Sequence, residues 1–223
     1  GLTLKQVASL LSREASIDSS RFVSLSTDTG FIETLGIKAR SLEGYLFPDT
    51  YNIFWKMDPA RVIKMMVTRL RGIFNDAHQE QAKRMGYTVH EILTMASMVE
   101  REARLPEERA LIAGVLYNRI RIDMPLQCDA TVQYALPEYK EVLIYADLHV
   151  NSPYNTYLYY GLPPGPIGNP GAGSILAALY PEETDYLYYV AKGDGSHIFS
   201  RTKQEHARAK VEARLTRQST RRH

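Results

Sequence analysis

The sequence is poor in cysteine: Cys128 is the one cysteine among its 223 residues. A single thiol excludes an intramolecular disulfide framework and any zinc site built from a cysteine cluster. The six histidines are scattered along the chain without metal-ligand spacing. His90-Glu91 begins like a metalloprotease helix, but Thr94 stands where the second histidine would be. We therefore predict that the protein holds neither a metal nor a cofactor.

Long hydrophobic runs are also missing, because no apolar stretch approaches the roughly 18 residues that a membrane span needs. No secretory signal opens the chain, which begins at Gly1 without a methionine, and we expect an N-terminal anchor to precede this point. Neither a phosphate-binding glycine loop nor a glycine-flanked nucleophilic serine is present. These absences argue against nucleotide chemistry and against a serine hydrolase.

The composition is that of a globular protein, with 44% hydrophobic and 23% charged residues. This length suits one domain with a small appendage. The net charge of +2 hides a basic tail, since residues 201–223 hold eight Lys/Arg against two acids. The body has no basic patch interleaved with aromatics, so we interpret the tail as a solvated last helix and exclude nucleic acid as a partner.

The order of helix and strand signals predicts an α+β protein. Residues 1–55 resemble a small α/β unit that opens with a helix at the capping box of residues 3–6. One long helix is expected over residues 59–85, one over 88–104, and one from Pro106. Residues 151–173 hold five of the eleven prolines and five of the fourteen glycines, which predicts an irregular segment. Residues 185–200 are typical of a β-hairpin with a Gly-Asp-Gly-Ser turn.

One carboxylate stands out on the helix that begins at residue 88. At 100° per residue, Glu100 lies about 80° from Ile92, inside the apolar arc, whereas Arg101 and Glu102 are expected to project elsewhere. Burial disfavours the charged form of a carboxyl and tends to raise its pKa, as a general acid at neutral pH requires. The alternative is a structural Glu100 paired with a basic residue such as Arg119 or Arg121.

Two further polar groups are candidates for substrate binding. Gln127 and Asp129 would share one face if residues 126–131 are extended, although Asp129 alone is more typical of a turn or helix cap. Tyr154, Asn155 and Thr156 lie in the irregular segment and offer the aromatic faces, amides and hydroxyls that sugar-binding clefts use.

Several of these blocks together resemble the YceG-like family. They occur in family order and are LEGYLFPDTY (42–51), ASMVERE (96–102), LQCDATVQY (126–134), YNTY (154–157), GLPPGPI (161–167), NPG (169–171) and GSHIFS (195–200). One departure is Cys128, where Ser or Thr is usual in relatives. The resemblance covers nearly the whole chain.

The resemblance implies a bacterial, membrane-anchored, extracytoplasmic enzyme that cuts peptidoglycan glycan strands as an endolytic lytic transglycosylase. It also implies a LysM-like subdomain at residues 1–55, a catalytic domain at residues 56–223, and association with peptidoglycan synthases, the penicillin-binding proteins. Glu100 would be the catalytic residue, acting first as acid and then as base. Gln127, Asp129, Tyr154, Asn155 and Thr156 would position the strand.

A lytic transglycosylase needs no second carboxylate to activate water, because the C6 hydroxyl of the sugar closes a 1,6-anhydro ring. A solitary buried glutamate fits that reaction better than it fits a paired-acid glycosidase. Two alternatives stay open at this point. One is a muramidase-type hydrolase in which Asp129 or another acid activates water. The other is a non-catalytic peptidoglycan-binding scaffold of the wall-synthesis machinery.

Overall fold

Three short helices begin the chain in the computed structural model, which describes residues 1–138, 140 and 142–220. They are α1 (Leu4–Ala15), α2 (Ser19–Thr27) and α3 (Thr29–Thr34). The predicted capping box is present: the Gln6 N–H donates to Thr3 Oγ1 at 3.3 Å, and the Thr3 N–H donates to Gln6 Oε1 at 2.8 Å. Asp18 and Asp28 cap α2 and α3 by accepting hydrogen bonds from the N–H groups of Arg21 and Phe31.

Residues 1–55, all of which the structure describes, contain these three helices and no strand. The α/β character expected of this segment is therefore wrong, because the polar stretches between the helices form caps and turns. A domain boundary at residue 55, and the LysM-like nature of the part before it, stay predictions. The buried core runs across that point, from Phe22 and Leu42 to Ile63 and Ile92.

The single long helix expected over residues 59–85 is two helices, α4 (Pro59–Ile73) and α5 (Asp76–Arg84). The chain leaves the helical conformation at Phe74, whose ring is buried. Asn75 then starts the next helix by accepting a hydrogen bond from the His78 N–H at 3.1 Å. Burial of one aromatic ring and a new cap thus outweigh the continuous helical period.

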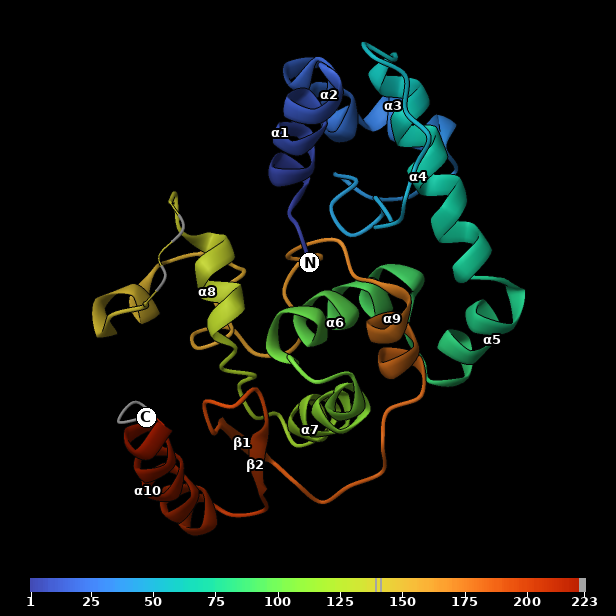
Figure 1. Cartoon of the computed structure of the whole chain (residues 1–223). Coiled ribbons are helices and arrows are strands. Elements are labelled where there is room, and N and C mark those ends of the chain that lie inside the picture. Colours follow the sequence, from blue (N-terminus) through green and yellow to red (C-terminus); the bar gives the residue numbers. More distant parts are fainter. Residues whose placement is uncertain (139, 141, 221–223) are drawn as a thin grey trace.

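Three packed helices form the centre of the molecule (Figure 1). They are α6 (Val89–Glu102), α7 (Arg109–Arg121), which follows a short 3₁₀ turn η1 (Pro106–Glu108), and α9 (Ala172–Leu179). The predicted capping box of Thr88 and Glu91 starts α6. Every residue from 92 to 99 is buried, so α6 is enclosed on nearly all sides.

The remaining elements are α8 (Asp129–Ala135), a 3₁₀ segment η2 (Tyr145–His149), and the hairpin of β1 (Tyr188–Ala191) and β2 (His197–Ser200). The strands are antiparallel, with Tyr188 opposite Ser200. The last helix, α10 (Lys203–Thr220), packs on this hairpin (Figure 1). Residues 221–223, the end of the predicted basic tail, lie outside the described residues. The hairpin, the irregular segment before α9 and the α+β class are all confirmed.

One asparagine fastens the loop after the first helices to the loop before α9. The Oδ1 of Asn169 accepts hydrogen bonds from the N–H groups of Gly44 and Leu46, at 2.9 and 3.0 Å. Its Nδ2 donates to the Leu2 carbonyl at 2.9 Å. In the part of the chain that the structure describes, no helix combines the length and apolar content needed to cross a bilayer.

Candidate active site

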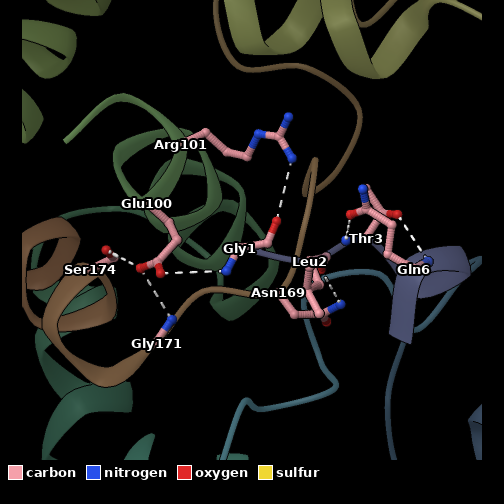
Figure 2. A network of polar contacts seen from close by, with 9 residues as sticks. All are labelled: Gly1, Leu2, Thr3, Gln6, Glu100, Arg101, Asn169, Gly171 and Ser174. Atoms are coloured by element: carbon pink, nitrogen blue, oxygen red, sulfur yellow. Dashed lines mark hydrogen bonds and ion pairs between the residues drawn. The ribbon is translucent and has the colours of Figure 1, made fainter. Parts of the chain in front are cut away.

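The last turn of α6 carries two carboxyls with different surroundings, Glu100 and Glu102. The Glu100 carboxylate points at the start of α9 (Figure 2), where Ser174 Oγ donates to it at 2.5 Å and the Gly171 N–H donates at 3.3 Å. The amino group of Gly1 lies 3.5 Å from its other oxygen. Its side chain is 19% exposed. Glu100 therefore occupies the N-terminal end of α9, where a negative charge is stabilised.

The electrostatics of Glu100 differ from the expectation. Burial pushes its pKa up, but the Ser174 hydroxyl, the Gly1 amino group and the Gly171 N–H together hold the pKa below its ordinary value. The predicted rise in pKa is therefore wrong. Pairing with Arg119 is wrong as well, because Arg119 donates to the carbonyls of Leu126 and Leu187, both at 2.6 Å.

Glu102 lies deep among protein atoms yet keeps some surface open, contrary to its expected projection away from the buried side. Cys128 Sγ donates to its Oε1 at 2.8 Å, and the Tyr189 hydroxyl donates to its Oε2 at 3.2 Å. Burial raises the pKa of Glu102, and the nearby Asp129 charge raises it further, while the two donors and His197 oppose this. The net effect is a raised pKa, which extends the pH range over which Glu102 keeps its proton.

Two clefts meet at Glu102. The larger has a volume of about 780 Å³ and lies between the hairpin, the start of α10 and the loop before α8. The smaller, of about 650 Å³, extends toward the turn of the hairpin. Glu102, Asp129, Ala191 and His197 border both clefts. A carboxyl with a raised pKa thus lies where the two clefts meet.

Of the residues predicted to bind substrate, Gln127 and Asp129 border the larger cleft. They do not lie on an extended segment, since Gln127 has a left-handed φ of 47° and Asp129 begins α8. The Asp129 carboxylate accepts a hydrogen bond from the Tyr157 hydroxyl at 2.5 Å. The Gln127 N–H donates to the Thr156 carbonyl at 3.0 Å, which fixes this segment against the irregular loop.

The other three predicted residues border neither of these two clefts. Asn155 is fully buried and donates to the carbonyls of Leu148 and Val150. Thr156 is also buried, and its Oγ1 accepts from the Cys128 N–H at 3.0 Å. Tyr154 is partly buried, with its ring centroid 4.9 Å from that of Tyr134. In this conformation the side chains of Asn155 and Thr156 hold the loop together and border neither of the two clefts.

Several cleft residues were missed from the sequence, namely Glu102, Tyr157, Tyr189 and His197. Tyr157 closes the same YNTY block that supplied three candidates, and His197 lies in the predicted hairpin. Its ring nitrogen Nδ1 lies 2.6 Å from Glu108 Oε2, and the Tyr189 and His197 rings meet edge to face. The sequence signal that could have identified Glu102 is its helical-wheel angle, which lies only about 20° outside the apolar arc of the helix.

No group of three or more His, Cys, Asp or Glu residues with metal-binding geometry occurs within residues 1–138, 140 and 142–220. The polar groups of the clefts are hydrogen-bond donors and acceptors that suit a hydroxyl-rich ligand. A carboxyl able to give up and take back a proton, placed between two grooves, is suited to acid catalysis on a chain-like substrate.

The chain is similar to known proteins over most of its length. The model of a family described as the YceG-like family matches residues 1–212. The chain is 42% identical over 210 residues to an endolytic murein transglycosylase of Bacillus subtilis, covering 92% of this chain and 57% of that protein. It is 32% identical over 234 residues to the protein of that name in Streptococcus pneumoniae, covering 93% of this chain and 42% of that protein. The chain therefore spans about half the length of these curated relatives.

A solved structure of a yceG-like protein from Listeria monocytogenes superposes with a TM-score of 0.82 at 37% identity. The match covers 92% of this chain and 72% of that one.

Proposed function

This chain belongs to the YceG-like family, and from that premise we propose that it is the catalytic part of an endolytic peptidoglycan transglycosylase. The substrate is the β-1,4 bond between N-acetylmuramic acid and N-acetylglucosamine within a glycan strand. The product carries a 1,6-anhydro ring on the muramic acid. The observation that carries the proposal is the raised pKa of Glu102 at the junction of the two clefts.

Glu102 supplies the acid. Its proton goes to the glycosidic oxygen as the bond from C1 to that oxygen breaks, which leaves positive charge at C1. The Glu102 carboxylate then takes the proton from the C6 hydroxyl, whose oxygen bonds to C1 and closes the ring. Atoms and charges balance without water, so one carboxyl serves both steps.

The two neighbours of Glu102 suit this cycle. Burial holds the pKa values of Cys128 and Tyr189 well above their usual ranges, so both groups keep their protons as Glu102 changes state. Their hydrogen bonds stabilise the carboxylate formed after proton donation and fix its orientation. Cys128 thus supplies the donor that a Ser or Thr hydroxyl would supply.

Glu100, the acid that the family resemblance implied, is the competing proposal. Its carboxylate already accepts hydrogen bonds from the Ser174 hydroxyl and the Gly171 N–H, and both hydrogen bonds lower its pKa. A group in that state holds no proton at neutral pH and is committed to the start of α9. The comparison of the two carboxyls therefore favours Glu102 as the acid and Glu100 as a structural anchor.

Endolytic action is supported by the open form of the site. Because Glu102 borders two open clefts, a strand that occupies both would continue beyond the scissile bond in both directions. Gln127, Asp129 and Tyr157 would contact sugars in the larger cleft. Tyr154, Asn155 and Thr156 would act by holding the loop that carries Tyr157.

A muramidase-type hydrolase is the second candidate, and Asp129 is the observation that favours it. This carboxylate borders both clefts together with Glu102 and could activate a water molecule. Its hydrogen bond with Tyr157 instead suits a fixed charge that keeps the pKa of Glu102 high.

The whole protein is further proposed to be anchored in the bacterial cytoplasmic membrane with its catalytic part outside. There it would cut nascent strands beside the penicillin-binding proteins. Family resemblance supports this context.

The products of a peptidoglycan digest test the proposal. Uncrosslinked glycan strands incubated with the protein should yield fragments ending in anhydromuramic acid by mass spectrometry. Fragments heavier by one water would identify a hydrolase. Bound strands without any soluble product would identify a binding scaffold, and either result would overturn the proposed reaction.

A further inference from the structure

The α10 side of the larger cleft is lined by cationic and imidazole groups. Lys203, His206 and Lys210 come from α10, and Arg119 comes from α7. Lys203 and Lys210 are exposed, whereas Arg119 is buried at 6%. The two carboxyls that border the same cleft are Glu102, whose raised pKa favours the neutral form, and Asp129. Positive charge therefore dominates this side.

This positive charge is not neutralised within the part of the chain that the structure describes. Arg119 donates to two carbonyls and lies over the Tyr188 ring, with its Cζ 5.5 Å from the ring centroid. No ion pair with a described acid is formed by Arg119, Lys203 or Lys210. The carboxylates of the protein thus leave the cationic side of the cleft open to an anion.

His206 adds a second, independent sign of a missing ligand. Its Nδ1 is buried and has no hydrogen-bond partner among the described residues, although its ring stacks on Tyr188 at 5.1 Å between centroids. Burial lowers the pKa of His206, and the charges of Lys210 and Arg119 lower it further. These three groups therefore lie within one another's field and would all gain from an anion between them.

The smaller cleft, which Glu102 also borders, has cationic side chains as well. Arg101 and Arg104 border it, together with Asp129 and the shared Glu102. A polymer that crosses both clefts would meet cationic side chains in each of them. Such an arrangement suits a polymer with an anionic group on every second unit, because one anionic group can then lie in each cleft at the same time.

We propose that Lys203, His206 and Lys210 of α10, with Arg119, form a subsite for a carboxylate carried by the muramic acid units of the strand. The inference rests on the proposed function for the identity of the polymer. In peptidoglycan the muramic acid units bear a lactyl group or the acidic peptide attached to it, whereas the glucosamine units are neutral. This subsite would make the protein prefer carboxylate-bearing strands over neutral β-1,4 glycans.

Binding of fluorescently labelled glycan strands, measured by anisotropy, tests the subsite without depending on turnover. All proteins carry Glu102→Gln, which keeps the neutral form of the acid and prevents cleavage. Three ligands are compared: peptide-bearing strands, the same strands after carbodiimide and methylamine convert their carboxylates to amides, and strands stripped of peptide by an amidase. The last retain a free lactyl carboxylate, so the comparison separates the two sources of charge.

Peptide-bearing or stripped strands should bind about threefold to tenfold more tightly than neutralised ones, as expected for two partly exposed ion pairs. The double change Lys203→Gln/Lys210→Gln should abolish this preference. Lys38→Gln/Lys64→Gln removes the same charge near α3 and on α4, at the opposite end of the molecule from α10 (Figure 1), and should preserve it.

Equal binding of native and neutralised strands would overturn the subsite, as would an undiminished preference in the α10 variant or an equal loss in the control pair. Failure of the proposed reaction would be seen separately, in the products of the digest.

Discussion

Glu43 is a buried carboxyl outside the candidate active site. We predict that its contribution to the stability of the protein falls as the pH rises toward neutrality. The side chain is 7% exposed and accepts hydrogen bonds from the Leu4 N–H at 2.9 and 3.1 Å. It also accepts from Asn169 Nδ2 at 3.2 Å and from the Tyr134 hydroxyl at 3.4 Å. Glu43 thus joins the start of α1 to α8 and to the loop before α9.

The size of the effect follows from the shift in pKa. Burial raises the pKa of Glu43 from 4.5 to about 7, against the opposing effects of hydrogen bonds from Leu4, Tyr134 and Asn169 and of the Arg101 charge. Between these values the folded protein holds a proton that the unfolded chain releases. The contribution of Glu43 to the free energy of unfolding therefore falls by about 1.4 kcal/mol per pH unit, or about 3 kcal/mol in all. The stabilisation is complete below about pH 4.5 and is lost above about pH 7.

Urea unfolding followed by circular dichroism at 222 nm measures this effect, because Trp55 is 67% exposed and would report poorly by fluorescence. Glu43→Gln removes the titration, while Glu102 titrates in both proteins. The free energy of unfolding of the parent minus that of the variant should decrease by about 3 kcal/mol between pH 4.5 and 7.5. Parallel pH profiles would refute the reasoning, and an increase would mean that the hydrogen bonds outweigh burial.

Two further predictions concern a glycine and the cysteine. Gly44→Ala should lower the free energy of unfolding in urea by about 3 kcal/mol or more, because Gly44 has a φ of 86° and an added Cβ would overlap the Pro166 ring. Gly86→Ala is the control, with a φ of 80° but open space around the added Cβ, and should lower it by only about 1 kcal/mol. Equal losses in the two variants would contradict this reasoning. Cys128→Ala removes a donor that lowers the pKa of Glu102, so the basic limb of the pH–rate profile should move to higher pH. Cys128→Ser keeps a donor and should leave the limb in place. An unmoved limb in Cys128→Ala would count against the assigned hydrogen bond.

Elements with local signals could be predicted from the sequence. Thr3 and Thr88 each start a helix through a side-chain hydrogen bond formed within four residues. The turn around Gly193 and Gly195 has positive φ at both glycines, which closes the predicted hairpin. These features depend on neighbouring residues only, so tertiary packing did not change them.

Features that depend on packing could not be predicted in this way. The break at Phe74 comes from the burial of its ring, which no helical period reports. Helical periodicity assumes one exposed face, but α6 is enclosed on nearly all sides, so the angles of Glu100 and Glu102 did not tell which carboxyl faces a cleft. The amide of Asn155 is of a kind that binds sugars, yet it donates its hydrogen bonds to the carbonyls of Leu148 and Val150 in its own loop.

The assignment of Glu102 as the acid is tested most directly by Glu102→Gln beside its matched control Glu100→Gln. Both variants are first checked by circular dichroism, and both are then incubated with uncrosslinked glycan strands whose products are read by mass spectrometry. Glu102→Gln should fold and yield no anhydromuramic products, because its amide has no proton to exchange with substrate. Glu100→Gln should keep turnover within about tenfold of the parent while losing about 1 kcal/mol of stability at the start of α9. Anhydromuramic products from Glu102→Gln, with none from a folded Glu100→Gln, would contradict the account.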